Sequence, residues 1–216
     1  MPVLTTSPRF VRTNVTYFTD DMSGHSNGDT PDTAMYESYS GTPVVIDYQS
    51  NTMRLLPSSG AYIQAQLGVK DSWLNTGNGN FIATWDMTVG PTVTGGWIGV
   101  RYNGYGSGNR YYIMHNLMSG SCSATKDTAY SGTGFGTDYG VAAAGVNDVL
   151  HITLCVNNGV QQYWSQLNGG TNTKGWEGTD SAWVTPEFLI WSQNGAVGDP
   201  LLIYADNILI KSGPLL

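Results

Sequence analysis

Apolar and polar residues alternate along several short stretches of the chain, which is the pattern of β-strands with one buried face. The clearest alternation runs over Phe81–Val89, where odd-numbered positions are apolar and even-numbered ones mostly polar. Val149–Val156 alternates in the same way. Asn158-Gly159 then supplies a two-residue turn, and Val160–Leu167 returns as the second strand of a hairpin. These stretches predict antiparallel strands that pack on a core through one face.

The stretch Leu201–Lys211 near the end of the chain is apolar at both parities. Leu202, Tyr204, Ile208 and Ile210 occupy one side, and Leu201, Ile203 and Leu209 occupy the other. Because neither side can be wholly exposed, this stretch predicts a last strand at the centre of a sheet.

Turn-forming residues separate the remaining strand-like stretches and leave no window for a long helix. His25–Tyr39 and the Gly-rich Ser119–Gly140 are expected to be loops. The total is ten to thirteen strands, more than one twisted open sheet carries comfortably, so two packed antiparallel sheets are expected. The other predicted strands are Asn14–Phe18, Val44–Tyr48, Met53–Leu56, Ala61–Leu67, Trp97–Tyr102, Arg110–Leu117 and Trp183–Trp191.

The length of 216 residues suits one β-sandwich domain with tails. We expect a domain over residues 15–212, an extended N-terminal arm over 1–14 and a short tail over 213–216. The arm contains two prolines and little periodicity, so it is either disordered or adds a strand to a neighbouring subunit.

Charged residues make up only 12% of the chain, and the net charge is −7. Nucleic acid and anionic membranes are therefore excluded as partners, since binding to them needs clustered Lys and Arg. There is no apolar run long enough for membrane insertion, and the N-terminus lacks the features of a signal peptide. The chain is thus expected to be mature or to leave a cell by another route, such as lysis. A polar surface poor in charge favours an extracellular protein or a component of a virion surface.

Two cysteines, Cys122 and Cys155, allow one bridge at most. Cys155 falls in a predicted strand and Cys122 in a predicted loop. Because neither flank resembles a disulfide-dense scaffold, free thiols are favoured over a bridge.

The order of features resembles the concanavalin A-like and laminin G-like jelly-roll superfamily over roughly residues 15–212. The similar segments are Phe18-Thr19-Asp20-Asp21-Met22, Gly96–Tyr102 with Tyr111-Tyr112-Ile113, Leu167-Asn168-Gly169, and Ala205–Ile210. The resemblance implies that the first and last strands pair in one sheet, which would bring Asp20 or Asp21 near Asp206. It does not select a function, because this superfamily includes lectins, glycan hydrolases, lyases, adhesion modules and virion proteins.

Asp20, Asp21 and Asp206 are the candidate ligands of a structural Ca²⁺, which prefers hard oxygen donors. The alternative is that these acids serve the turns at strand ends. No His/Cys spacing typical of zinc occurs, and no other cofactor is expected.

Catalytic candidates are few. The three glutamates, Glu37, Glu177 and Glu187, form no motif, and Asp86 stands alone, so no glycosidase acid pair can be named. Lyase chemistry would need a His or Tyr base beside an Arg. The middle hairpin offers Arg101, Tyr102, Tyr111 and His115, and the alternative is that the tyrosines pack on one another while Arg101 caps a carboxylate.

Aromatic residues are the remaining functional signal, with seven Trp and thirteen Tyr in the chain. Flat rings with a polar tip suit both sugar faces and protein interfaces, and the alternative is that half or more of them fill the core. The residues that we expect to contact a ligand are Trp97, Arg101, Tyr102, Tyr105, Tyr111, Trp164 and Trp176.

Together these features predict a non-catalytic, surface-exposed recognition or assembly module. A bacteriophage virion component fits best, such as a decoration or fibre protein that packs on other subunits, as a homo-oligomer or against capsid or tail proteins, and contacts glycans. The alternative is a secreted carbohydrate-active enzyme, a glycan hydrolase or lyase, or its carbohydrate-binding module.

Overall fold

The computed structural model describes residues 15–38, 45–58, 63–70, 80–91, 95–102, 110–128, 131–157, 159–180, 188–195 and 201–212. Within these ranges the chain forms sixteen strands in two antiparallel sheets, with no helix, and therefore none long enough to cross a membrane. The strands are β1 (Thr16–Asp20), β2 (Tyr36–Ser38), β3 (Val45–Gln49), β4 (Thr52–Leu56), β5 (Gln64–Val69), β6 (Phe81–Val89), β7 (Gly96–Tyr102), β8 (Arg110–Asn116), β9 (Cys122–Thr128), β10 (Ser131–Gly134), β11 (Thr137–Asp138), β12 (Val149–Asn157), β13 (Val160–Leu167), β14 (Asn172–Thr179), β15 (Phe188–Asn194) and β16 (Ile203–Ser212).

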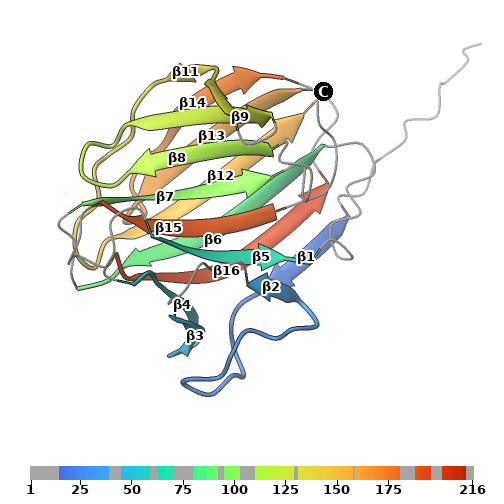
Figure 1. The fold of residues 1–216 in the computed structure, drawn as a ribbon, viewed down its shortest axis with the longest axis vertical. Helices are drawn as coiled ribbons and strands as arrows, with labels where there is room; N and C mark the ends of the chain where they lie inside the picture. Colours follow the sequence, from blue (N-terminus) through green and yellow to red (C-terminus); the bar gives the residue numbers. More distant parts are fainter. Residues whose placement is uncertain are drawn as a thin grey trace, which may run out of the picture.

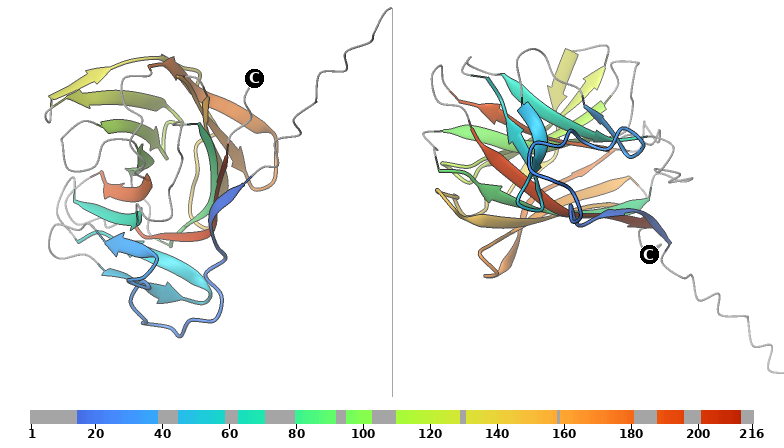
Figure 2. Two further views of the ribbon diagram at one scale, coloured as in Figure 1. Left: turned by 90° about the vertical axis from the view of Figure 1, so that its right-hand side faces the viewer. Right: turned by 90° about the horizontal axis from the view of Figure 1, so that it is seen from below.

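The two sheets lie face to face as a sandwich (Figure 1). The nine-stranded sheet has the order β11-β14-β13-β12-β6-β16-β4-β3, and β1 also pairs with β16. The seven-stranded sheet has the order β10-β9-β8-β7-β15-β5-β2 and is curved so that its outer face is concave (Figure 2, left). We call the face of each sheet that is turned away from the other sheet its outer face. The predicted all-β, two-sheet sandwich is confirmed.

The core lies between the sheets and follows the alternation expected from the sequence. In β6 every odd-numbered residue is buried and every even-numbered one is half-buried. Trp85 is fully buried and meets Phe188 of the opposite sheet edge-to-face, with ring centroids 5.5 Å apart. Such contacts between aromatic rings add to the free energy gained by removing apolar area from water.

The last strand, β16, lies inside the nine-stranded sheet, as predicted. It pairs with β6 on one side and with β4 and β1 on the other. A bulge interrupts its register with β6 between Asp206 and Leu209, where Asn207 has a φ of 52°. The pairing of β1 with β16 confirms that the first and last strands share a sheet.

The predicted hairpin is formed by β12 and β13, which pair from Leu150 opposite Leu167 to Asn157 opposite Val160. Gly159 in its turn has a φ of 81°, a conformation that suits glycine. Asn158 lies outside the described residues.

The prediction of a long surface loop over Ser119–Gly140 is wrong. This segment contains β9, β10 and β11, and Cys122 is a buried strand residue and not a loop residue. The predicted loop His25–Tyr39 likewise contains β2, and the strand β14 was not predicted. These strands are short or rich in Gly, Ser and Thr, so large apolar residues do not mark their buried face.

Both cysteines are free thiols, as the sequence favoured. Cys122 lies in the seven-stranded sheet and is buried, and Cys155 lies in the nine-stranded sheet and is half-buried. The predicted arm over residues 1–14 and the tail over 213–216 lie outside the described residues.

Candidate functional site

The outer face of the seven-stranded sheet gathers polar and aromatic side chains from four adjacent strands. In β7 the inward residues are Ile98, Val100 and Tyr102, so Trp97, Gly99 and Arg101 face outward. The neighbouring strands expose their own alternate residues on the same face, because paired residues share a face across a ladder.

Strand register places these residues in rows across β5, β15, β7 and β8. The first row is Gln64, Gln193, Trp97 and Asn116, the second is Gln66, Trp191, Gly99 and Met114, and the third is Gly68, Leu189, Arg101 and Tyr112. We define the aromatic-amide cluster as Gln64, Gln66, Trp97, Arg101, Tyr112, Trp191 and Gln193.

Gly99 provides the space in which the indole of Trp191 lies. A Cβ atom added to Gly99 would come within 2.4 Å of Trp191 Cζ2 and 2.3 Å of the Ile113 carbonyl oxygen. The same indole meets Tyr112 in a T-shaped contact, with ring centroids 6.2 Å apart. Because Gly99 has no side chain, the indole of Trp191 packs directly on the backbone of β7. From this position it contacts Tyr112.

Trp191 has an exposed fraction of 1%, and no described residue accepts a hydrogen bond from its Nε1. At this depth a ligand on the outer face does not reach the Nε1 of Trp191, so the indole supports the neighbouring ring of Tyr112 from below the surface.

Two guanidinium groups lie over the ring of Tyr112. Cζ of Arg110 is 4.9 Å from the ring centroid and Cζ of Arg101 is 5.9 Å from it. Both distances are within the range of cation–π attraction. The ring of Tyr112 therefore lies beside two guanidinium groups and is half-buried.

Three glutamine side chains form a chain of hydrogen bonds on the same face. Gln66 Nε2 donates to Gln64 Oε1, and Gln64 Nε2 donates to Gln193 Oε1 at 2.5 Å. Since each amide carries both a donor and an acceptor, the chain ends in the acceptor of Gln66 and the donors of Gln193. No described residue occupies these two ends.

The structure describes six of the seven predicted ligand contacts and places them at three locations. Trp97 and Arg101 lie in the aromatic-amide cluster; Trp97 is half-buried and Arg101 has an exposed fraction of 7%. Trp164 is half-buried on the outer face of the other sheet, where its Nε1 is 3.4 Å from Gln162 Oε1. Tyr105 lies outside the described residues.

Tyr102, Tyr111 and Trp176 are core residues and not surface contacts, which corrects the expectation for these three. The Tyr102 hydroxyl donates to Gln161, the Tyr111 hydroxyl donates to Asp180 at 2.5 Å, and Trp176 Nε1 donates to the Phe135 carbonyl at 3.1 Å. Each ring is fully buried and its polar tip is satisfied inside the protein, so a surface ligand cannot reach it.

The lyase candidates of the middle hairpin are also separated. Arg101 faces outward, whereas Tyr102, Tyr111 and His115 face the core. Tyr112, one residue from Tyr111 and on the opposite face, is the tyrosine that shares a face with Arg101.

The candidate calcium ligands converge only in part. Asp20, Asp21 and Asp86 all act on Asp206, but the pKa of Asp206 is raised mainly because its carboxyl is partly buried. The Asp20 oxygens accept from the Met22 amide and the Tyr36 hydroxyl. Among the described side chains no group of three or more His, Cys, Asp or Glu could hold a metal ion, so calcium remains a sequence prediction.

Asp86 also faces Asp206 across the ladder of β6 and β16. One Asp86 oxygen is 2.7 Å from His151 Nδ1, and the other accepts from Asn207 Nδ2 at 2.8 Å. Both oxygens of Asp86 are thus occupied by His151 and Asn207. Asp86 and Asp206 therefore lie side by side on a sheet face, next to the bulge of β16, and do not face each other across a cleft.

Neither a family model nor a curated protein matches this sequence. Solved structures do match over most of the chain. They include the VIP36 exoplasmic/lumenal domain in its Ca²⁺/Man3GlcNAc-bound form, with a TM-score of 0.61, 8% identity and coverage of 87% of this chain and 88% of that one. The GH43 protein BlXynB from Bacillus licheniformis has a TM-score of 0.60 and 12% identity, and the match covers 90% of this chain but only 39% of that one.

A third match is the CBM2 module of the evolved Dit of Lactobacillus casei BL23 phage J-1. Its TM-score is 0.56 at 10% identity, over 92% of this chain and 96% of that one. At such identities the likeness establishes the fold alone. The two antiparallel sheets, the pairing of the first and last strands and these structural matches together show that the chain has the concanavalin A-like jelly-roll fold.

Proposed function

We propose that this protein is a non-catalytic glycan-recognition module that binds an extended oligosaccharide across the outer face of the seven-stranded sheet. The observation that carries the proposal is the aromatic-amide cluster, in which aromatic rings alternate with amide and guanidinium groups. Rings pack on the apolar faces of sugars, and amides exchange hydrogen bonds with hydroxyl groups.

The spacing of the cluster favours more than one sugar ring. Trp97 and Tyr112 lie on adjacent strands, but Trp97 is paired with Asn116, four residues along β8 from Tyr112. Four strand residues span roughly 13 Å, so a ligand that touches both rings must be an oligosaccharide. The structural likeness to the Man3GlcNAc-bound VIP36 domain, to a GH43 protein and to a phage CBM2 module supports glycans as the ligand class.

We further propose an extracellular or virion-surface location, in contact with other protein subunits of the same or another kind. The support is the low share of charged residues and the likeness to a module of a phage protein. On this account, glycan binding attaches an assembly to a surface that displays the glycan.

Replacing Trp97 by alanine is expected to weaken oligosaccharide binding by about tenfold or more, because an aromatic ring that packs on a sugar face supplies much of the binding energy. Affinity is measured by calorimetry on a panel of xylan, β-glucan and mannan oligosaccharides and mucin glycans. Trp164→Ala is the matched control, since Trp164 is also half-buried but lies on the outer face of the other sheet. Equal losses for the two variants, or no binding by the unmodified protein, would contradict the proposal.

A lyase acting on an acidic glycan is the second candidate, favoured by the position of Arg101 and Arg110 beside Tyr112. An arginine can neutralise a substrate carboxylate while a tyrosine takes or gives a proton. Incubation with alginate and pectin, followed by absorbance of unsaturated products, separates the two candidates: product formation that Tyr112→Phe abolishes would establish the enzyme. The recognition module predicts binding without product.

A further inference from the structure

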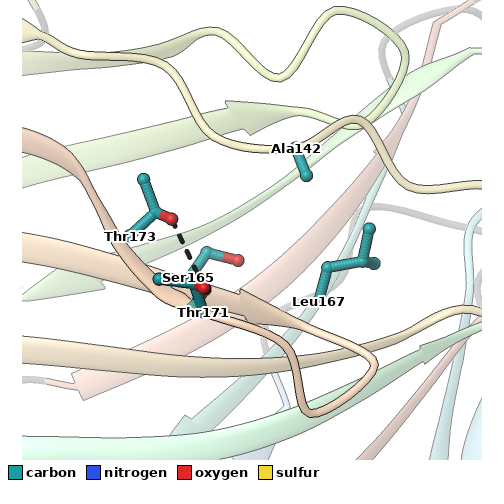
Figure 3. A pocket seen from close by; sticks show the side chains of 5 residues that line it. All are labelled: Ala142, Ser165, Leu167, Thr171 and Thr173. Atoms are coloured by element: carbon teal, nitrogen blue, oxygen red, sulfur yellow. Dashed lines mark hydrogen bonds between the residues drawn. The ribbon is translucent and has the colours of Figure 1, made fainter.

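A pocket lies at the end of the β13–β14 hairpin, whereas the aromatic-amide cluster belongs to the seven-stranded sheet (Figure 3). Its volume is about 280 Å³, and five side chains line it: Ala142, Ser165, Leu167, Thr171 and Thr173. Ser165 and Thr173 are cross-strand partners on β13 and β14, and Ala142 belongs to the segment that follows β11. The pocket is therefore formed by the nine-stranded sheet and one neighbouring segment.

Backbone hydrogen bonds fix both walls of the pocket. On one side, the amides of Val141 and Ala144 donate to the carbonyls of Gly120 and Leu117, each at 2.8 Å. On the other side, the Gly170 amide donates to the Leu167 carbonyl at 2.8 Å, within the hairpin turn. Because its walls are anchored, the pocket is formed before any ligand arrives, which lowers the cost of binding.

Ser165 is the polar group that points to a ligand. Its exposed fraction is 3%, and its hydroxyl is directed into the space between the lining side chains (Figure 3). No described residue forms a hydrogen bond with that hydroxyl. An alanine would fill the position without a hydroxyl, so the serine presents one donor and one acceptor to a molecule bound in the pocket.

The lining selects the chemical class of the guest. None of the five residues carries a charge, so an ionised guest would lose its hydration without gaining a partner. A purely apolar guest would strip the Ser165 hydroxyl of water. A molecule with hydroxyl groups and exposed C–H surface satisfies both Ser165 and the side chains of Leu167 and Ala142.

The volume selects the size. A space of about 280 Å³ lies just below the range of pockets that hold drug-sized ligands and equals the share of about nine liquid waters. We propose that this pocket binds one neutral sugar ring, as a site separate from the oligosaccharide face and independent of it.

The proposal is tested by saturation-transfer NMR and titration with methyl glycosides of a neutral hexose, a 6-deoxyhexose and an N-acetylhexosamine. Binding in the millimolar range is expected for at least one of them, and methyl glucuronoside should not bind. Ser165→Ala should weaken that binding by about threefold to tenfold, the value of one net hydrogen bond. Ala142→Trp should fill the pocket and abolish binding.

Ala143→Trp is the matched control, because Ala143 is the exposed neighbour of Ala142 and does not line the pocket. It should leave the affinity unchanged within about twofold. Circular dichroism checks that each variant is folded, and Ser165→Ala, which adds no bulk, serves if Ala142→Trp does not fold. The proposal is overturned if no methyl glycoside binds, if the glucuronoside binds equally well, or if Ser165→Ala binds as tightly as the unmodified protein.

Discussion

Gly99→Ala is expected to lower the free energy of unfolding by about 3 kcal/mol, the upper part of the range for overpacked interiors. The new methyl group would overlap both the Ile113 carbonyl oxygen and the indole of Trp191. The Ile113 carbonyl belongs to the ladder between β7 and β8, so it can move away from the methyl group only if the two strands separate. The indole of Trp191 must be displaced from its position as well. Because Trp191 and Tyr112 are in contact, the same change should also weaken oligosaccharide binding.

Chemical denaturation of the two proteins measures the effect. Gly134→Ala is the matched control, since Gly134 is also a strand glycine of the seven-stranded sheet but a Cβ there would meet nothing closer than the Ala124 carbonyl oxygen at 3.9 Å. It should change the free energy of unfolding by less than about 1 kcal/mol. If both variants were equally stable, the close approach of Trp191 to Gly99 would not be a constraint on the fold.

His115 is expected to make the fold sensitive to acid. Burial lowers its pKa from 6.5 to about 4, with Asp138 opposing the shift. The unfolded chain therefore binds a proton that the folded protein resists, so the stabilisation is complete above the unfolded pKa and is lost as the pH falls from 6.5 towards 4. Linkage gives a loss of roughly 3 kcal/mol across that interval.

The measurement compares unfolding free energies of the unmodified protein and His115→Leu at several pH values. The difference between the two curves isolates His115 from the carboxyl groups, which titrate in both. Tyr163→Phe is the control, since it removes the hydroxyl 3.3 Å from His115 Nδ1 while the imidazole stays buried, so its pH dependence should resemble that of the unmodified protein. Parallel curves for His115→Leu and the unmodified protein would refute a buried neutral imidazole.

The fold could be predicted where large side chains alternate. In β6, β12 and β16 the apolar residues mark the buried face directly, and the two sheets follow from the number of such strands. The strands β9, β10 and β14 were hidden because Gly, Ser and Thr occupy positions that face the core or solvent alike. In β14, Gly175 and Gly178 are buried because neighbouring side chains take their space, a constraint that only the packed structure reveals.

The candidate site could be predicted only in part. The sequence indicates Trp97 and Arg101 because one is aromatic and the other charged. Both also share the side of their predicted strand with Gly99, opposite its apolar residues. Tyr112 could have been found from the register of the predicted hairpin, in which it faces Arg101. The glutamines of β5 and Trp191 of β15 could not, because β15 joins β5 to β7 although these strands are far apart in the sequence. Tyr102, Tyr111 and Trp176 are predicted to lie at the surface because Gly-rich segments lie near them in the sequence, whereas the packed structure buries all three.

The most direct test of the oligosaccharide face is an amide NMR titration with whichever oligosaccharide of the panel binds most tightly. The largest shift changes should fall on β5, β7, β8 and β15, with the indole signals of Trp97 and Trp191 among them. Shift changes concentrated on β12, β13 and β6 of the nine-stranded sheet, around Trp164 and His151, would place the ligand on the opposite side of the sandwich and refute binding at the aromatic-amide cluster.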